Sequence, residues 1–386
     1  MYSRTPYLFS NWRDYLSAAT TGILPSQALR EAVAAGHVIS SSPISDEQIQ
    51  PSSLDLRLGP VAHRIRASFL PKPGSTIIEK LTESKLYDLD LSRPCVLERG
   101  CVYIAPLMEE LRLPASYSGK ANPKSSTGRI DVFTRLITEF GGDFETVPDG
   151  YKGRLYTEIV PRTFSIVVRQ GDRLNQLRLR RGKPQPANAV LTRLHTEEVL
   201  VYKNDEAAAK PLIEDRSLWL SVDLSGEDDS GLIGYRARKN APLIDLAEIN
   251  HYEIADYWEP ICRTKAQNLI LDPREFYILA SKEKVRIPPD YAAEMLPYDP
   301  SVGEFRIHYA GFFDPGFGYG ADDIKGTHAV LEVRSHEVPF LLEDGQVVAA
   351  LEYHQLLDVP DKIYGQGIGS SYQHQRLALS KHFRKL

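Results

Sequence analysis

Cysteine is scarce in this chain: only Cys95, Cys101 and Cys262 occur among its 386 residues. Three cysteines at such uneven spacing exclude the disulfide framework that holds many small secreted domains together. The sequence also lacks an apolar run of about 18 residues, and it lacks the charged, apolar and small-residue segments of a leader. We therefore expect a cytoplasmic protein without a membrane span or a signal peptide.

An excess of positive charge is also missing, since the formal net charge is −5. Nucleic-acid and membrane-surface partners are therefore not expected, whereas a small anionic ligand held by a few local cations is compatible with this composition. The length suits two domains of about 190 residues each.

An internal repeat organises most of the chain. With a shift of 174 residues, Val96–Tyr117 aligns without a gap to Ile270–Tyr291, and Arg154–Leu179 aligns to His328–Tyr353. We interpret the chain as a tandem duplication with a first module at 1–185, a connecting segment at 186–216 and a second module at 217–386. The identical pairs are Leu97/Leu271, Tyr103/Tyr277, Ile104/Ile278, Glu109/Glu283, Arg112/Arg286, Pro114/Pro288, Tyr117/Tyr291, Glu158/Glu332, Gly171/Gly345 and Leu177/Leu351.

Short strands separated by turns dominate both modules. A helix is predicted to begin at Ser26 as N-cap and to end at Gly36. Beyond it, alternating patterns punctuated by Pro and Gly favour a mainly β fold, either a sandwich or a jelly-roll-like barrel. A further helix is expected around Ile244–Ile254, and the Gly-, Ser- and Gln-rich tail after Pro360 is typical of a mobile segment.

The segment Lys124-Ser125-Ser126-Thr127-Gly128-Arg129 combines small hydroxyl groups, a glycine and two cations. Serine hydroxyls, backbone N–H groups and an arginine fork can together hold a phosphate or a carboxylate. The same composition is also typical of a surface turn.

A second segment runs from Ala310 to Gly318 and reads AGFFDPGFG. Asp-Pro-Gly favours a turn, and the glycines let backbone groups approach a flat ligand closely. Such a hairpin can read the edge of a base without side chains; the alternative is a plain β-hairpin stabilised by its phenylalanines.

The third feature is the repeated acid, Glu158 and Glu332, within apolar strand patterns. Burying an unpaired carboxylate costs several kcal/mol, so each glutamate either faces solvent or lies in a polar pocket. A solvent-exposed strand glutamate is the commoner case, and the presence of the acid at the same place in both repeats weakens that interpretation without removing it.

Together and in this order, these segments resemble the deoxycytidine triphosphate (dCTP) deaminases of the trimeric deoxyuridine triphosphatase (dUTPase)-like superfamily. The resemblance implies a mainly β chain of two tandem dUTPase-like distorted jelly-roll β-barrel modules with a few short helices. It rests on Gln50–Gly59, Leu97–Gly100, the loop with Ser125, Ser126 and Arg129, Gly171–Leu177, the hairpin Ala310–Phe317, the two glutamates, and a C-terminal Tyr364, Gln366, Gly367 and Ser370.

The resemblance implies hydrolytic deamination of dCTP at C4, which gives dUTP and ammonia without a catalytic metal. The sequence lacks the combination of H-x-E with P-C-x-x-C that marks zinc deaminases. A glutamate would move protons between water, N3 and the leaving amine, and the serine and arginine loop would hold the water, the carboxylate and phosphate oxygens. Mg²⁺ would enter only with the triphosphate.

Neither repeat holds the complete motif set. The first has Val147-Pro148-Asp149-Gly150 near the place of the hairpin, and the second has Asp299 and Gly303 in place of Ser125 and Arg129. Because the family's site lies between subunits, we predict one composite site per chain, with Ser125 and Arg129 facing Glu332 and with Glu158 as the other candidate base. The expected nucleotide contacts are Lys124, Ser126, Ala310, Gly311, Phe312 and Asp314, with Lys362, Tyr364 and Gln366 from a C-terminal lid.

Two alternatives stay open at this stage. The chain can hydrolyse dUTP to the monophosphate, alone or after deamination, since Asp314 matches the aspartate of phosphatase members although their tyrosine is missing. It can also bind a nucleotide without turnover, as a regulatory protein. A homo-oligomer is expected in each case, because the family builds rings of three modules and this chain supplies two.

Overall fold

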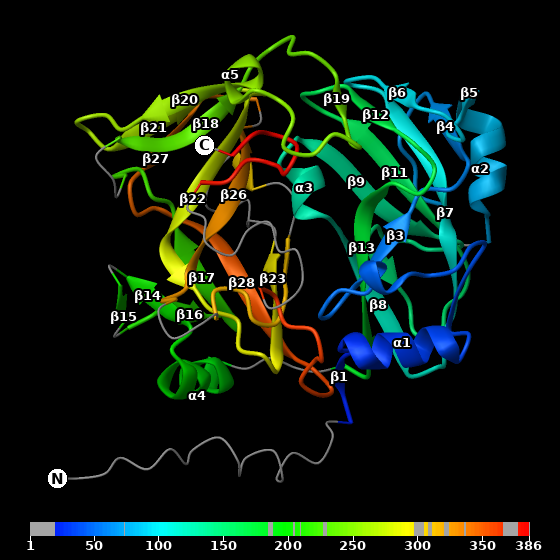
Figure 1. Cartoon of the computed structure of the whole chain (residues 1–386), viewed down its shortest axis with the longest axis horizontal. Helices are drawn as coiled ribbons and strands as arrows, with labels where there is room; N and C mark the ends of the chain where they lie inside the picture. Colours follow the sequence, from blue (N-terminus) through cyan, green and yellow to red (C-terminus); the bar gives the residue numbers. More distant parts are fainter. Residues whose placement is uncertain are drawn as a thin grey trace.

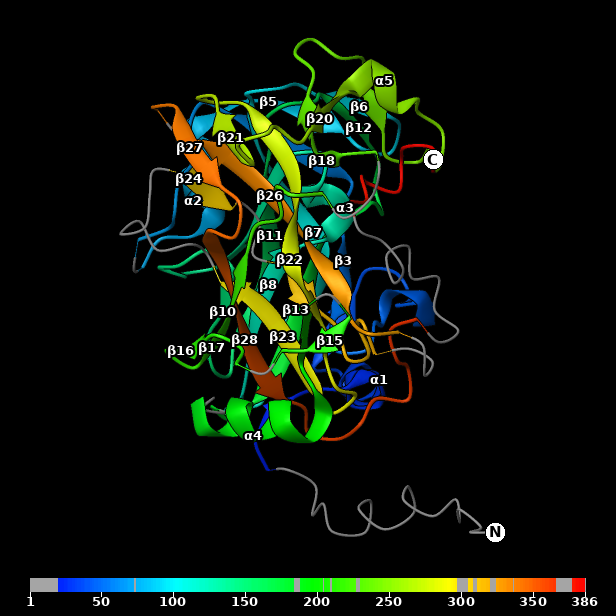
Figure 2. The ribbon, with the colours of Figure 1, turned by 90° about the vertical axis from the view of Figure 1, so that its left-hand side faces the viewer.

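The computed structural model describes residues 20–72, 74–183, 188–203, 205–208, 210–226, 230–296, 305–307, 311–319, 324–335, 337–365 and 377–385. Two β-rich modules lie side by side, with the short helix α3 (Ser125–Gly128) between them (Figure 1). Figure 2 shows the strands of the second module in front of those of the first. The predicted mainly β tandem fold is therefore confirmed. No helix among the described residues is long and apolar enough to span a bilayer.

The first module consists of two main sheets and a small third one. In one main sheet the order is β1 (Gly22–Ile23), β13 (Arg173–Arg181), β8 (Tyr117–Pro123) and β10 (Thr146–Val147), with β3 (Leu54–Arg57) beside β13. The other has the order β5 (Lys85–Asp90), β4 (Val61–Ile65), β7 (Val102–Arg112), β11 (Lys152–Pro161) and β9 (Val132–Thr138), with β2 (Val38–Ser40) beside β7. The small sheet contains β6 (Cys95–Leu97) and β12 (Ile166–Val168) and takes β19 (Ile244–Asp245) from the second module.

The second module repeats this plan. One sheet has the order β15 (Glu206–Ala207), β14 (Val201–Lys203), β22 (Phe276–Val285), β18 (Leu232–Ala237) and β20 (Trp258–Cys262), with β26 (Thr327–Ser335) between β22 and β24 (Phe305–Ile307). The other has the order β16 (Ile213–Glu214), β17 (Ser217–Ser221), β28 (Val347–Gln355), β23 (Tyr291–Leu296) and β25 (Phe312–Phe313). A separate pair joins β21 (Asn268–Leu271) and β27 (Phe340–Glu343).

The strand register reproduces the sequence repeat. Glu158 pairs with Ile104 between β11 and β7, and Glu332 pairs with Ile278 between β26 and β22. The tyrosines of the repeat also keep one role, because the Tyr103 hydroxyl accepts the N–H of Glu98 and the Tyr277 hydroxyl accepts that of Asp272. The duplication therefore preserved hydrogen-bonding positions as well as hydrophobic ones.

The helices are short. The first begins at Ser26 and ends before Gly36, as predicted, but its N-cap is Pro25 and the Ser26 hydroxyl donates to Asp361 instead of capping the helix. The predicted capping role of Ser26 is therefore wrong. The helices are α1 (Ser26–Ala34), the 3-10 helix η1 (Asp46–Gln48), α2 (Ile77–Ser84), α3 (Ser125–Gly128), α4 (Asn188–Glu198) and α5 (Ile254–Tyr257).

The segment 186–216, expected to be a connection with little strand pattern, contains α4, β14, β15 and β16. Val201 pairs with Val285 just as Val38 pairs with Leu111 in the first module, so β14 repeats β2. The constant shift of 174 residues does not hold before β7 and β22, which is why the sequence comparison did not detect this part of the repeat.

The prediction for Ile244–Ile254 also needs correction. Its expected helix is wrong: Ile244 and Asp245 form β19, which runs parallel to β12 of the first module, and α5 begins only at Ile254. A strand here completes the small sheet of the neighbouring module, a long-range pairing that local propensity does not encode.

The main hydrophobic core crosses the boundary between the modules. Phe164 packs edge-on against Trp258 at 5.5 Å between ring centroids, and Leu379 and Phe383 from the C-terminal segment join the same cluster. Much of the tail expected to be mobile lies outside the described residues, but 377–385 is packed and Phe383 bridges to Tyr252. For these last residues the expectation of a mobile tail is wrong.

Candidate active site

The predicted loop Lys124–Arg129 is a single helical turn, α3, on the first module, and it faces β26 of the second. A Cβ atom added to Gly128 would lie 2.3 Å from Oε2 of Glu332. The carboxylate therefore packs directly against the glycine backbone, and a larger residue at this position would force the Glu332 side chain to shift. The two halves predicted to form a composite site meet within one chain (Figure 1).

The alternation of side chains along β26 explains which way the Glu332 side chain points. Leu331 and Val333 on either side of it belong to the core of the second module, so Glu332 points out of that core towards α3. Its side chain is only 7% exposed. Burial raises the pKa of Glu332 well above the usual value for glutamate; Arg129 opposes this effect and Asp131 adds to it.

Asp131 is itself fixed by a contact between the modules. Arg334, two residues beyond Glu332 on β26, pairs with Asp131 and donates to the Thr163 hydroxyl at 2.8 Å. Thr163 also donates to Asp131, at 2.5 Å. This network attaches β26 to the first module immediately beside Glu332.

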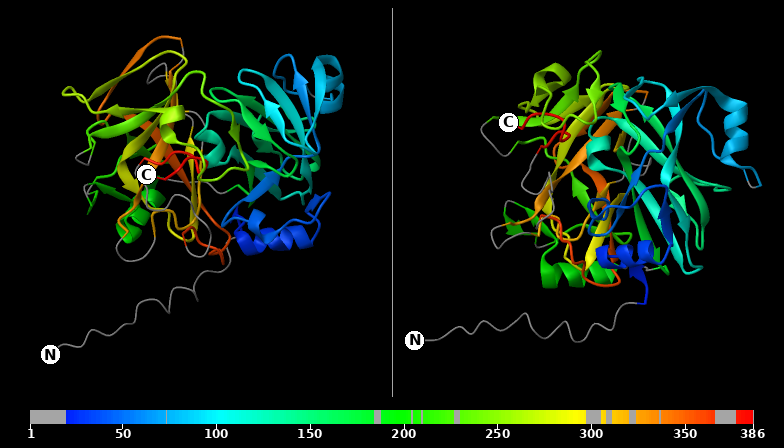
Figure 3. Two further views of the ribbon diagram at one scale, coloured as in Figure 1. Left: turned by 45° about the horizontal axis from the view of Figure 1, so that its top comes forward. Right: turned by 45° about the vertical axis from the view of Figure 1, so that its right-hand side comes forward.

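The C-terminal segment lies beside α3 (Figure 3). The Ser380 hydroxyl donates to the carbonyl of Ser126 at 2.8 Å, and Arg129 donates to the carbonyl of Ala378 at 2.9 Å. Arg129 is 7% exposed and Ser126 is 8% exposed, whereas Ser125 is half-buried. The end of the chain therefore helps to hold α3 in place.

The second predicted element, the Asp-Pro-Gly hairpin, lies against the first module. Asp314 accepts a hydrogen bond from the Ser52 hydroxyl at 2.8 Å and lies 3.6 Å from Arg178. The Arg178 guanidinium stacks over the Phe312 ring at 3.9 Å, and the carbonyl of Gly311 accepts the N–H of Met295. Burial raises the pKa of Asp314, while Arg178 and Ser52 oppose the change.

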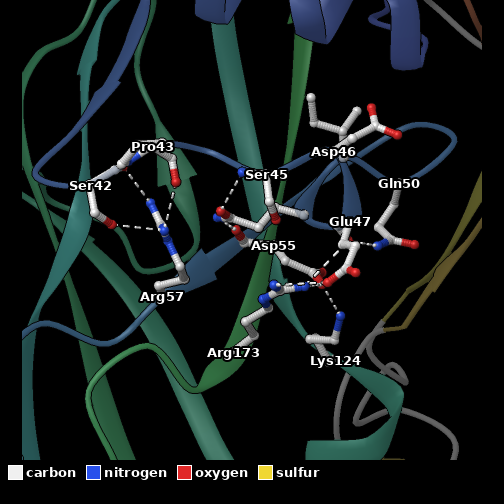
Figure 4. A network of polar contacts seen from close by, with 12 residues as sticks. Ser42, Pro43, Ser45, Asp46, Glu47, Gln50, Asp55, Arg57, Lys124 and Arg173 are labelled. Carbon is white, nitrogen blue, oxygen red and sulfur yellow. Dashed lines mark hydrogen bonds and ion pairs between the residues drawn. The ribbon is translucent and has the colours of Figure 1, made fainter.

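Asp55 links the hairpin to α3. It pairs with Lys124, lies 3.8 Å from Arg173 (Figure 4), and acts electrostatically on Asp314. Beside these groups is a cavity of about 260 Å³. Lys124 and Ser126 line it together with Arg173 and Lys381. The carboxylates of Asp55 and Asp172 also line the cavity, so its three cations and Ser126 are the groups that suit an anionic ligand.

Glu158 has a different environment. It is fully buried and pairs with Arg135 of the neighbouring strand at 2.5 Å. The Arg135 guanidinium packs over the Phe144 ring at 3.5 Å. The structure thus does not bring Glu158 to α3, and neither repeated glutamate is solvent-exposed.

The lid residues are placed in part. Lys362 donates to the carbonyls of Asp46 and Ile49 at 2.6 and 3.0 Å, and the Tyr364 ring lies 5.6 Å from that of Phe317. The start of the expected lid is therefore docked on both modules. Ala310 and Gln366 lie outside the described residues.

Sequence reasoning missed several residues that assemble these contacts. Arg178 lies one residue beyond the motif Gly171–Leu177, and Ser52 was used only as part of the motif Gln50–Gly59. Arg334 and Ser380 belong to no motif. For Arg334 the only signal was its position two residues after Glu332, which places both side chains on the same face of one strand. Among the described residues, no group of His, Cys, Asp and Glu side chains gathers as a metal site.

Comparison with known proteins agrees with this architecture. Residues 20–183 match the 2'-deoxycytidine 5'-triphosphate deaminase (DCD) N-terminal domain, and residues 187–383 match the C-terminal domain of the same family. The chain therefore belongs to the 2'-deoxycytidine 5'-triphosphate deaminase family.

A crystal structure of 2'-deoxycytidine 5'-triphosphate deaminase from Agrobacterium tumefaciens is 51% identical, with a TM-score of 0.83. The match covers 88% of this chain and all of that one. A dCTP deaminase, dUMP-forming, from Corynebacterium kroppenstedtii is 29% identical over 36% of this chain and 69% of its own length. A dCTP deaminase from Halorubrum lacusprofundi is 30% identical over 36% of this chain and 64% of its own length. These shorter matches correspond to about one module.

Proposed function

We propose that this chain catalyses the hydrolytic deamination of dCTP to dUTP and ammonia at one composite site between its two modules. The observation that carries the proposal is the contact of the buried Glu332 carboxylate with Gly128, which joins the second module's acid to the first module's serine and arginine turn. Membership of the deaminase family supplies the substrate class.

Glu332 is the proposed general base and acid. A carboxylate whose pKa is raised by burial can accept a proton from water near neutral pH and release it again. Water would add to C4 of cytosine as Glu332 takes its proton. The carboxyl group would then protonate N3, take the proton of the new C4 hydroxyl group and pass it to the amino group, so that C4–N breaks, C4=O forms and ammonia leaves.

The neighbouring groups would position the reactants. Arg129 lowers the cost of ionising Glu332, and the half-buried Ser125 offers a hydroxyl at the same turn. Lys124 and Ser126 would hold phosphate oxygens in the cavity beside α3, where Lys381 is a further candidate. Mg²⁺ would arrive with the triphosphate, and no step of the deamination requires it.

The hairpin and the docked C-terminal segment would complete the enclosure of the bound nucleotide. Arg178 and Ser52 hold Asp314, so the backbone of Gly311 and Phe312 is fixed for contact with a base. Lys362 and Tyr364 anchor the start of the expected C-terminal lid. A chain cut at Asp361 would also lose Leu379 and Phe383 from the core, so point substitutions test the role of the lid better than truncation does.

Product analysis tests the proposal. Incubation of the purified chain with dCTP, dUTP, CTP and dTTP, read separately for ammonia and pyrophosphate, should give ammonia from dCTP with the triphosphate intact. Binding of dCTP without either product would contradict the proposal and would indicate a regulatory protein.

A second candidate function is formation of the monophosphate by the same chain. The C. kroppenstedtii relative is named as dUMP-forming, and the present chain has an aspartate in the hairpin. Asp314 is held by Ser52 and Arg178, which makes it less suited to activating water. Pyrophosphate released in step with ammonia would favour this function over deamination alone.

A further inference from the structure

A separate and larger cavity opens between the modules. It has a volume of about 790 Å³, within the range of roughly 300–1,000 Å³ found for small-molecule pockets. Seven of its sixteen lining residues are Arg or Lys and two are Glu, so its lining is strongly positive. Lys124, Ser126, Glu332 and the hairpin do not line it. We call it the basic groove.

Five of the seven Arg and Lys residues that line the basic groove pair with acidic side chains. Arg274 pairs with Glu337 at 3.1 Å, and Lys239 pairs with Glu275 at 2.7 Å. Arg135, Arg238 and Arg334 pair with Glu158, Glu259 and Asp131, which do not line the groove.

The other two cations that line the groove are Arg99 and Arg162. Within the described part of the chain, neither has an acidic side chain within ion-pair distance, and both are exposed. Two guanidinium groups at one cavity, without partners among these residues, provide a site of net positive charge.

The duplication explains why the groove exists. Under the 174-residue shift, Arg99 corresponds to Pro273 and Thr163 to Glu337, and all four residues line the groove. Equivalent turns of the two modules therefore meet at this place. A single module supplies only one set of these turns, so the groove is a product of the tandem arrangement.

We propose that the basic groove binds a phosphate-bearing anion, either an inorganic oligophosphate or the phosphate chain of a nucleotide. Planar guanidinium groups bind phosphate oxygens through paired hydrogen bonds, and Arg99 and Arg162 are the side chains free to do so. Phe133 also lines the groove and carries the Arg135 guanidinium over its ring at 4.7 Å. These planar groups would let a base stack if the ligand is a nucleotide.

The groove adjoins the candidate active site through Arg334 and Thr163, which line it and contact Asp131 beside Glu332. The test is therefore made on binding, with turnover measured separately. Calorimetric titrations with inorganic tripolyphosphate would compare the unsubstituted chain with the double variant Arg99→Ala/Arg162→Ala. The matched control is Arg93→Ala, an exposed arginine outside the groove whose acidic neighbour is Asp90 at 3.6 Å.

The double variant should lose roughly tenfold in tripolyphosphate affinity for each arginine removed. Added salt should weaken binding to the unsubstituted chain. Arg93→Ala should bind like the unsubstituted chain, and dCTP turnover by the double variant should be unchanged. A parallel titration with ATP separates the sources: tighter binding than tripolyphosphate indicates a nucleotide, and equal binding indicates that only the phosphates are recognised.

Equal tripolyphosphate affinity in the unsubstituted chain and the double variant would overturn the proposal. So would a change in sedimentation mass caused by the double substitution, because the groove would then be a contact between copies of the chain. Neither result bears on the deamination of dCTP, which the product analysis tests independently.

Discussion

The two repeated glutamates occupy the same strand register and have different neighbours. Glu158 lies on a face of β11 that its own module covers, with Tyr156 in a small cluster under α2, and it pairs with Arg135. Glu332 lies on the corresponding face of β26, which the other module covers through α3. The residues paired with the two glutamates differ in the same way: Ile104 belongs to the small local cluster, and Ile278 belongs to the main core that crosses the boundary between the modules.

This difference shows how one module can give two kinds of acid. We propose a structural role for Glu158, because its carboxylate is buried and paired with an arginine inside its own sheet. A carboxylate held against the backbone of another module, with a raised pKa, is suited to proton transfer. The surrounding module, more than the strand that carries the glutamate, decides its role.

Exchanging each acid for its amide gives the largest expected contrast. Glu332→Gln should lower the rate of dCTP deamination by about 10²–10⁴-fold, the usual contribution of a general acid–base group. Glu158→Gln should retain most of the activity per folded molecule. Ammonia release by both variants at saturating dCTP checks this, and loss of activity only in Glu158→Gln would reverse the assignment.

Removing the arginine partner of Glu158 should act on stability instead. Arg135→Ala leaves a fully buried carboxylate unpaired, which should lower the free energy of unfolding by about 3 kcal/mol. The control is Arg236→Ala, which breaks a pair of the same 2.5 Å length with the more exposed Glu259 and should cost less than about 1 kcal/mol. Urea titrations would measure both, and equal losses would refute a special role for the buried pair.

Crowding the contact between Gly128 and Glu332 tests the composite site directly. Gly128→Ala places a methyl group where the carboxylate lies, and the shift should reduce kcat by about 100-fold. Gly142→Ala is the matched control, because an added Cβ there meets no atom within 4 Å. Unchanged turnover in Gly128→Ala would show that this contact is not part of the reacting geometry.

The smallest effect concerns pH. Because the folded-state pKa of Glu332 is raised, folding favours its protonated form, and this contribution is lost as the pH rises through the folded-state pKa. Glu332→Gln should therefore be more stable than the unsubstituted chain above that pKa. The gain is about 1.4 kcal/mol for each unit by which the folded-state pKa exceeds the unfolded-state value.

This gain should vanish at acidic pH, below the ordinary glutamate pKa. Unfolding titrations at several pH values measure it, with the exposed Glu206→Gln as control. A constant difference between Glu332→Gln and the unsubstituted chain across pH would contradict the raised pKa. The same shift should place the acidic limb of the rate profile at a higher pH than an ordinary glutamate gives.

Part of this account could be predicted from the sequence. The repeat, the mainly β class, the helix from Ser26 and the strands around Leu54 and Ile166 follow from patterns within a few residues of each other. The complementary loss of motifs predicted that Ser125 and Glu332 belong to one chain's site, and their modules do meet there. The helix expected at Ile244–Ile254 was wrong because β19 is stabilised by pairing with the other module.

The sequence by itself determined which side chains alternate out of each strand, because strand periodicity is local, and so it placed a glutamate on one face of β11 and of β26. Only the tertiary structure decided what covers each face. Arg135 lies across from Glu158, α3 lies across from Glu332, and the packed end of the chain at Ser380 contacts α3. Burial and electrostatics depend on groups far apart in the chain, and these set the pKa of Glu332.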